Sequence, residues 1–354
     1  MARTIDFSPL TSVVSQSELA AFREEVRNRP NYGRSGEIVT FVIVAVVLVF
    51  FGGFVLVSTI GGIGIILSAA SDGSPALLAT LAFPLLFTAI FVVVAVVALR
   101  AMFGPRRYIN WLRFERFAQA NGLIFSPADP NPAYPGSIFQ SGSSRTAVDH
   151  FRSATDRFLD YGNYRYTTGS GKNRRTHNWG FLALALDRSL PHMVLDSKAN
   201  NGLFGSNLAA FNRDQVLSLE GDFDTYFTLY CPAQYERDAL YVFTPDLMAL
   251  LIDNAAPFDV EIMDKWMFVY SASSFDMTQP AVHHRLLSIV DTVGAKTLTQ
   301  TDRYVDERVA DFAANVVAPP GQRLRRRFPL VAILILLAIV GFWVIPVLVA
   351  LFTR

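Results

Sequence analysis

The chain has 354 residues, of which 51% are hydrophobic and 17% are charged, and its formal net charge is +1. Ordinary soluble chains are about 25% charged, so this chain holds more apolar residues than a globular core needs. The balance of acidic and basic residues argues against a nucleic-acid-binding protein. Cys231 is the single cysteine, which excludes an intrachain disulfide and a cysteine-based zinc or iron–sulfur site within one chain.

The polar N-terminal segment, residues 1–37, contains a predicted amphipathic helix over 15–29. Ser15 and Glu18 stand at the spacing of a capping box, in which each side chain accepts a hydrogen bond from the other residue's backbone. Pro30 ends the helical pattern. One face of the predicted helix carries the apolar residues Leu19, Phe22 and Val26.

Three segments carry no Asp, Glu, Lys or Arg: residues 38–71, 73–99 and 328–353. Each exceeds the length of about 18 apolar residues that signals a membrane helix. We therefore expect three transmembrane α-helices, two N-terminal and one C-terminal. The predicted boundaries are 38–68, 76–103 and 329–352 for the helices, 69–75 for a short external loop, 104–328 for the large domain and 353–354 for the external C-terminus.

Positive charge sets the predicted orientation, because loops rich in Lys and Arg stay in the cytoplasm. The loop 69–75 has Asp72 and no positive residue. We therefore predict a multi-pass protein of the cell membrane whose N-terminal segment and large domain are cytoplasmic. Gly61, Gly62 and Gly64 favour an oligomer formed through the first span. The membrane-proximal basic residues on the domain side are Arg106, Arg107, Arg323, Arg325, Arg326 and Arg327.

Residues 104–328 are predicted to form an α+β domain, in which antiparallel strands mix with packed helices. Helices are expected over 107–120, 245–253, 280–293 and 302–316. The runs 158–166 and 179–186 are expected to pair as a hairpin with its tip at 168–176, and 258–262 and 266–270 as a second hairpin. Further strands are expected at 192–195, 215–219 and 224–230.

The tip of the first hairpin reads Gly-Ser-Gly-Lys over residues 169–172, which invites comparison with a phosphate-binding loop. The full pattern fails, because Tyr166 stands where the first glycine belongs and Asn173 where a Ser or Thr would hold magnesium. We interpret the segment as a basic hairpin tip that could meet a partner or lipid headgroups. The candidate interaction residues are Lys172, Arg174 and Arg175.

No metal site is predicted, and Asp222 and Asp224 are the residues that come nearest to one. An Asp-Phe-Asp triplet can offer two carboxylates to a divalent cation, but the same spacing fits a polar strand edge with Phe223 facing inward. His283 and His284 are adjacent on a predicted helix and point apart, so they do not form a two-ligand face. The sequence carries no hydrolase signature, and no cofactor is expected.

The stretch 217–270 resembles a bacterial membrane-protein family that is catalogued only as a domain of unknown function. The resembling residues concern packing and capping, so the resemblance implies a fold and no activity. They are Leu219, Glu220, Phe223, Tyr226, Phe227, Thr228, Tyr230, Arg237, Ala239, Leu240, Thr244, Pro245, Leu247, Met248, Trp266 and Tyr270.

The function we expect is that of a binding or scaffolding module at the inner membrane surface, without catalysis of its own. Its expected partners are the lipid bilayer and a protein at the cytoplasmic face, and nucleic acid is not among them. One alternative is a membrane-tethered enzyme that acts on lipid or envelope precursors through Asp222 and Asp224. A second alternative is an accessory subunit of a transport complex. The sequence names neither the ligand nor the physiological process.

Overall fold

In the computed structural model the chain divides into two compact units, Asp6–Ala120 and Met1–Ile5 with Asn121–Arg354. The structure describes residues 4–32, 46, 49–54, 57–58, 60–61, 86, 88–93, 96, 106–202, 207–208, 211–311 and 314–326.

In this described part of the chain, no helix is both long and apolar enough to cross a membrane. Its longest helix, α5 (Arg106–Ala120), has 15 residues, which corresponds to about 22 Å against a hydrocarbon core of about 30 Å. This finding corrects two predictions: the α+β domain anchored by three transmembrane α-helices, and the multi-pass protein of the cell membrane with a cytoplasmic domain. The predicted spans 38–68, 76–103 and 329–352 lie for the most part outside the described residues.

In the unit Asp6–Ala120, the described elements besides α5 include α1 (Ser8–Thr11), α2 (Gln16–Val26) and the 3-10 turn η1 (Pro30–Tyr32). The capping box is confirmed: the Glu18 backbone N–H donates to Ser15 Oγ over 3.2 Å, and the Ser15 backbone N–H donates to Glu18 Oε2 over 2.7 Å. The predicted apolar face of α2 is buried as well. The N-terminal helix therefore forms at the position that the capping box and the spacing of its apolar residues predicted.

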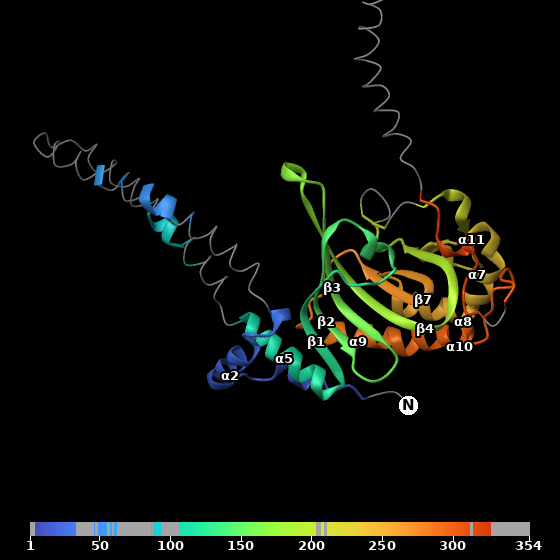
Figure 1. Ribbon diagram of the computed structural model, residues 1–354, viewed down its shortest axis with the longest axis horizontal. Coiled ribbons are helices and arrows are strands. Elements are labelled where there is room, and N and C mark those ends of the chain that lie inside the picture. Colours follow the sequence, from blue (N-terminus) through green and yellow to red (C-terminus); the bar gives the residue numbers. More distant parts are fainter. Residues whose placement is uncertain are drawn as a thin grey trace, which may run out of the picture. The chain divides into compact units, whose positions relative to one another are not determined.

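The second unit is built on a seven-stranded antiparallel sheet, and the fold class is therefore α+β (Figure 1). The strand order is β1-β2-β3-β4-β6-β5, and β7 pairs with the other side of β4. The strands are β1 (Leu123–Pro130), β2 (Ser143–Ser153), β3 (Leu159–Thr168), β4 (Arg175–Ser197), β5 (Val216–Leu217), β6 (Phe227–Tyr230) and β7 (Asp259–Ser271).

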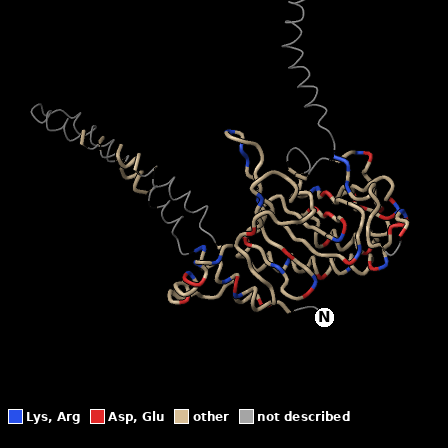
Figure 2. The backbone as a smooth tube through the Cα atoms, viewed as in Figure 1, with Lys and Arg blue, Asp and Glu red and all other residues tan. Residues whose placement is uncertain are grey.

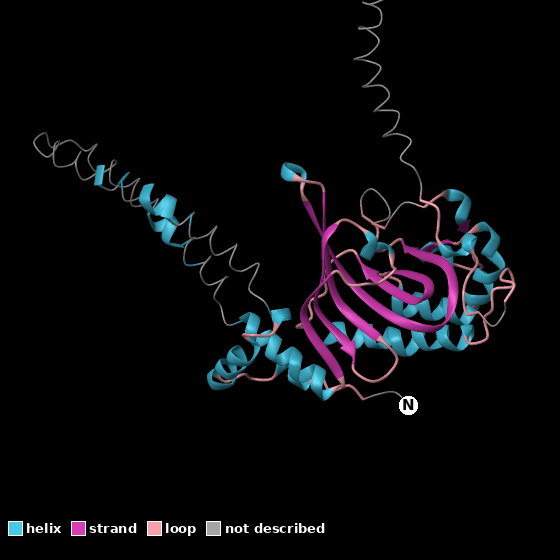
Figure 3. Ribbon diagram, viewed as in Figure 1, coloured by secondary structure: helices cyan, strands magenta, loops and turns pink. Residues whose placement is uncertain are grey.

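Helices α9 (Pro280–Ile289) and α10 (Ala295–Thr301) cover one face of this sheet (Figure 3). They are joined by the π-helical turn η6 (Val290–Gly294). A Cβ atom on Gly294 would stand 2.7 Å from Leu184 Cδ2, so glycine allows the helix backbone to approach β4. The other short elements are α6 (Phe223–Tyr226), α7 (Glu236–Val242), α8 (Pro245–Ala255), α11 (Pro319–Gln322), η2 (Ser137–Gln140), η3 (Gly171–Asn173), η4 (Arg213–Gln215) and η5 (Ala233–Tyr235).

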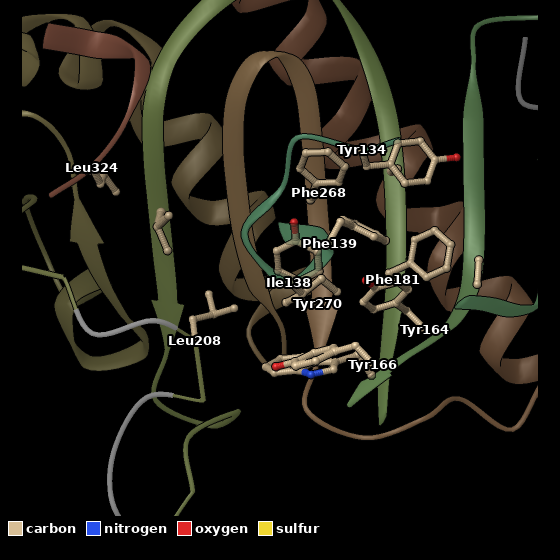
Figure 4. Packing of buried hydrophobic residues seen from close by; sticks show 14 of the residues in the cluster. Tyr134, Ile138, Phe139, Tyr164, Tyr166, Phe181, Leu208, Phe268, Tyr270 and Leu324 are labelled. Atoms are coloured by element: carbon tan, nitrogen blue, oxygen red, sulfur yellow. The ribbon is translucent and has the colours of Figure 1, made fainter. Parts of the chain in front are cut away.

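The opposite face of the sheet carries an aromatic core (Figure 4). It is covered by residues 131–142, the covering segment, which connects β1 to β2 and places Ile138 and Phe139 against the sheet. The Phe139 ring lies 4.6 Å from the Tyr164 ring and 5.4 Å from the Phe181 ring, and it is fully buried. Burial of such side chains is the main stabilising term of the unit.

Two helices, the start of a third and the first hairpin agree with prediction. Helix α5 covers the predicted 107–120, α8 covers 245–253, and α9 begins at Pro280 as expected. The predicted end of that third helix at 293 is wrong, because the chain stays helical through η6 and α10 to Thr301. Strands β3 and β4 form the predicted hairpin, paired from Leu159 with Leu184 to Thr168 with Arg175. These elements carry strong local signals, such as Pro245 and Pro280 at the first helical position.

Other elements differ from prediction. The expected hairpin of 258–262 and 266–270 is one strand, β7, because Asp264 with φ of 52° bends the strand without reversing it. The expected strand at 192–195 is the end of β4. The helix expected over 302–316 is absent among its described residues. There, the Asp306 carboxylate accepts hydrogen bonds from the backbone N–H groups of Arg308 and Ala318, which fixes an irregular path.

Candidate functional site

The tip of the β3–β4 hairpin, residues 169–174, projects beyond the rest of the sheet (Figure 1). Gly169 has φ of +73°, and a Cβ atom there would stand 2.3 Å from the Asn173 carbonyl oxygen. Glycine is therefore required for the turn. The Gly-Ser-Gly-Lys sequence forms this turn with η3, as the hairpin prediction required, and no long helix follows it as in a phosphate-binding loop.

The three basic residues predicted as an interaction site, Lys172, Arg174 and Arg175, are all exposed here. We call them the basic tip. No acidic residue occurs between Asp160 and Asp187, so residues 161–186, which include the tip, carry only positive formal charge (Figure 2). Within the described residues, none of the three forms an ion pair. The structure thus places three basic side chains, without a neutralising acidic partner, at the end of an ordered pair of strands.

The root of the hairpin is held by ring stacking and burial. Tyr166 and His177 face each other across the strands, with ring centroids 4.8 Å apart and an interplanar angle of 13°. Thr168 Oγ1 and His177 Nε2 are 2.8 Å apart and share a hydrogen bond. Trp179 is buried in the aromatic core below them. The basic tip therefore stands on a rigid base.

The arginines predicted to be membrane-proximal are divided between the two units. Arg106 and Arg107 open α5 in the first unit, and the Arg107 guanidinium lies 4.2 Å from the centre of the Trp111 ring. Arg323, Arg325 and Arg326 are exposed near the end of the described chain in the second unit. Arg327 lies outside the described residues.

Asp222 and Asp224 lie at α6, a single helical turn, and the predicted strand begins only at Phe227. The Asp224 carboxylate accepts hydrogen bonds from Ser218 Oγ and from the Leu219 backbone N–H, the latter over 3.2 Å. Asp224 therefore shapes the local turn. Among the described residues, no group of three or more His, Cys, Asp or Glu is arranged to hold a metal ion.

A buried carboxylate that the sequence analysis did not single out lies on β7. Glu261 is fully buried and accepts hydrogen bonds from four donors: the Ser137 backbone N–H (2.8 Å), Ser137 Oγ (2.5 Å), His192 Nε2 (2.7 Å) and the Tyr270 hydroxyl (2.7 Å). Burial opposes ionisation, but hydrogen bonds from His192 and Ser137 outweigh it and hold the pKa of Glu261 below its usual range. Ser137 belongs to the covering segment, so Glu261 ties that segment to the sheet.

The tautomer of His192 follows from its partners. Its Nδ1 atom accepts a hydrogen bond from the Leu324 backbone N–H over 3.0 Å. A backbone N–H can only donate, so the ring proton is on Nε2, which donates to Glu261. This imidazole links β4 to both β7 and the last described segment of the chain.

A second buried pair joins β2 and β3. His150 Nδ1 lies 2.7 Å from Asp160 Oδ1, and Nε2 lies 3.1 Å from Asp129 Oδ2. Burial favours the neutral ring, but the two carboxylates outweigh it and raise the pKa of His150 to about 9. Asp160 also accepts a hydrogen bond from the Tyr134 hydroxyl over 2.5 Å. His150 is therefore an imidazolium, and Asp160 is a second anchor for the covering segment.

A β-bulge makes this arrangement possible. Asp149 has φ of 45°, and the β2–β3 register shifts between Val148 and Phe151. A Cβ atom on Gly162 would stand 2.5 Å from His150 Cα, so only glycine leaves room for the bulged strand. The bulge turns His150 toward Asp160 on the aromatic-core face.

Asp259 is a third buried carboxylate, two residues before Glu261 on the same face of β7. It accepts hydrogen bonds from the Ser197 backbone N–H (2.8 Å) and from Asn200 Nδ2 (2.7 Å). Burial, reinforced by the charges of Asp196 and Glu261, raises the pKa of Asp259 to about 7 despite these donors. Glu261 and Asp259 resemble active-site groups in their perturbed pKa values, but the protein itself supplies the donors described above.

The comparisons with known proteins leave the family open. No family model matches the chain, and no curated protein matches it. Among solved structures, the chain is similar to the crystal structure of the mycobacterial trehalose monomycolate transport factor A, with 12% identity and a TM-score of 0.35 over 52% of this chain and 91% of that one. This likeness is too distant to carry an argument. The resemblance of residues 217–270 to an uncharacterised family therefore stays a prediction.

Proposed function

We propose that the second unit is a binding module that docks on an anionic partner through its basic tip. The observation that supports this is the charge at the end of the β3–β4 hairpin, where three exposed basic residues stand on an ordered base and residues 161–186 contain no acidic residue. The neutral composition of the chain shows that this charge is a local feature.

The basic tip contributes little to stability. Like charges held close together repel one another, and exposed basic side chains without an ion pair add nothing measurable to folding. The same three charges are free to contact a partner. Charge complementarity of this kind raises association rates and weakens as salt is added.

The geometry of Asp222 and Asp224 does not favour the alternative of an enzyme that uses them. Asp224 is engaged with Ser218 and Leu219 in its own turn. The proposal accordingly assigns no reaction to the chain. The alternative of a transport-complex subunit has no distinguishing contact among the described residues.

The experiment that tests the proposal is a binding panel with the full-length chain. The probes are a labelled polyglutamate peptide, vesicles that contain anionic phosphatidylglycerol and vesicles of neutral phosphatidylcholine. The tip variant carries Lys172→Gln, Arg174→Gln and Arg175→Gln. The control variant carries the exposed substitutions Lys265→Gln, Arg285→Gln and Arg303→Gln.

We expect tight, salt-sensitive binding to at least one anionic probe. The tip variant should bind that probe on the order of 100-fold more weakly, because each basic residue near an anionic surface strengthens binding about fivefold. The control variant should keep the wild-type affinity within about twofold. Equal binding by the tip and control variants to every anionic probe would overturn the proposal.

A further inference from the structure

We infer that the anionic partner is a layer of phospholipid headgroups, which the second unit contacts at two separate points. This inference rests on the proposed function and names the partner of the basic tip. It is carried by a second basic group, by the position of both groups, and by the chemistry of the tip.

The second basic group is assembled from segments about 110 residues apart in the sequence. The Asn212 backbone N–H donates to the Arg325 carbonyl oxygen over 3.0 Å, and the Arg325 backbone N–H donates to Gln215 Oε1 over 2.8 Å. Phe211 and Arg326 form an antiparallel bridge beside them. These bonds hold Arg213 next to the segment 323–326.

The second basic group consists of Arg213, Arg323 and Arg326, which are exposed. Arg325 lies among them but is paired with Asp214, with its Nη2 atom 2.6 Å from Asp214 Oδ2. In this pair the charges of Arg325 and Asp214 largely cancel. The positive charges of Arg213, Arg323 and Arg326 remain, so the group keeps a net charge of about +3. The fold, and not the local sequence, adds Arg213 to this group.

Both basic groups lie at one end of the second unit. In Figure 2, the hairpin tip and the segment that ends at residue 326 both lie along the upper edge of the unit and are well separated from each other in this view. A partner that meets both must be broad as well as anionic. A headgroup layer has that form, whereas a short acidic peptide reaches one group at a time.

The chemistry of the tip also favours headgroups over a protein. Residues 168–176 contain Thr, Gly, Ser, Lys, Asn and Arg, and no aromatic or aliphatic side chain. Protein interfaces draw most of their energy from a few buried anchors, and the large aromatic anchors among them are absent from the tip. Binding to headgroups needs only clustered Lys and Arg and no inserted apolar residue.

The test compares partition of the full-length chain between phosphatidylglycerol-containing and pure phosphatidylcholine vesicles. A contribution that does not depend on headgroup charge enters both binding constants equally, so their ratio isolates the effect of that charge. Four proteins are compared: the wild type, the tip variant, the control variant, and a second-group variant with Arg213→Gln, Arg323→Gln and Arg326→Gln. Circular dichroism confirms that each variant is folded.

We expect the wild type to bind anionic vesicles more tightly than neutral ones. In the tip variant and in the second-group variant alike, the ratio of the two binding constants should fall on the order of 100-fold. Added salt should also lower this ratio for the wild type, because salt screens the attraction between the basic residues and the headgroups. Peptide binding that depends on the tip, without a vesicle preference, would overturn this inference and leave the proposed function standing. A vesicle preference that survives in the second-group variant would overturn the two-point contact.

Discussion

The basic tip and the buried carboxylates belong to the same sheet, but the carboxylates are hydrogen-bonded within the protein whereas the basic side chains are exposed to solvent. Glu261, Asp160 and Asp259 accept hydrogen bonds from donors of the protein itself. Lys172, Arg174 and Arg175 face solvent. A buried charge that loses its partner is costly, whereas an exposed one changes stability little. The comparison therefore separates residues that hold the fold from residues that are available to a partner.

The largest expected effect is at Glu261. Replacing it with alanine leaves buried donors of Ser137, His192 and Tyr270 without an acceptor, and we expect a loss of about 3–5 kcal/mol in the free energy of unfolding. Glu307→Ala, at an exposed residue, should stay within about 0.5 kcal/mol. Urea unfolding measures both, and equal stability of the two variants would show that the buried network is not an anchor.

The second effect concerns pH. His150 has a folded pKa of about 9 against 6.5 ordinarily, so its contribution is fully present below pH 6.5 and is lost as the pH rises through 9. We expect wild-type stability to fall by about 3 kcal/mol more than that of His150→Gln across this window. His177→Gln is the control, because burial shifts the pKa of His177 in the opposite direction, below its usual value. Parallel pH profiles of wild type and His150→Gln would contradict the assignment.

A third effect tests the bulge that presents His150. Gly162→Ala places a Cβ atom against the His150 backbone, and we expect a loss of about 1–3 kcal/mol from overpacking. Asn178→Ala, at an exposed position of β4, should stay within about 0.5 kcal/mol. Thermal unfolding followed by circular dichroism compares them, and an unchanged midpoint for Gly162→Ala would mean that the strands can separate without cost.

The smallest effect on stability is expected at the basic tip. The tip variant should unfold within about 0.5 kcal/mol of wild type, because its side chains are exposed and form no ion pair among the described residues. Urea unfolding checks this directly. A loss comparable to that of Glu261→Ala would place the tip among the residues that hold the fold.

Local signals explain what the sequence could predict. The capping box of Ser15 and Glu18, the helix start at Pro245 and the β3–β4 hairpin each depend on neighbours within a few residues, and all three are present. Lys172, Arg174 and Arg175 could be recognised as one basic group because they lie within four consecutive residues, and their role as an interaction site stays a prediction. Arg213 was missed, since its place in the second basic group depends on contacts with the segment 323–326.

The buried network could not be predicted in the same way. In a strand, a polar residue between apolar ones usually marks the solvent face, so Asp160 and Glu261 looked ordinary. The sequence feature that could have indicated burial is the position of Glu261 between Val260 and Ile262, in a strand that is apolar on both faces. Similarly, Asp264 suggested a turn between two strands, but β7 continues through it with a positive φ.

The most direct test of the central claim is the affinity of the full-length chain for an anionic probe, measured side by side for the tip variant and the control variant at low and raised salt. The account predicts that removing the three charges of the basic tip weakens binding on the order of 100-fold at low salt and that salt narrows the difference. Equal affinities for the two variants at every salt concentration would contradict it.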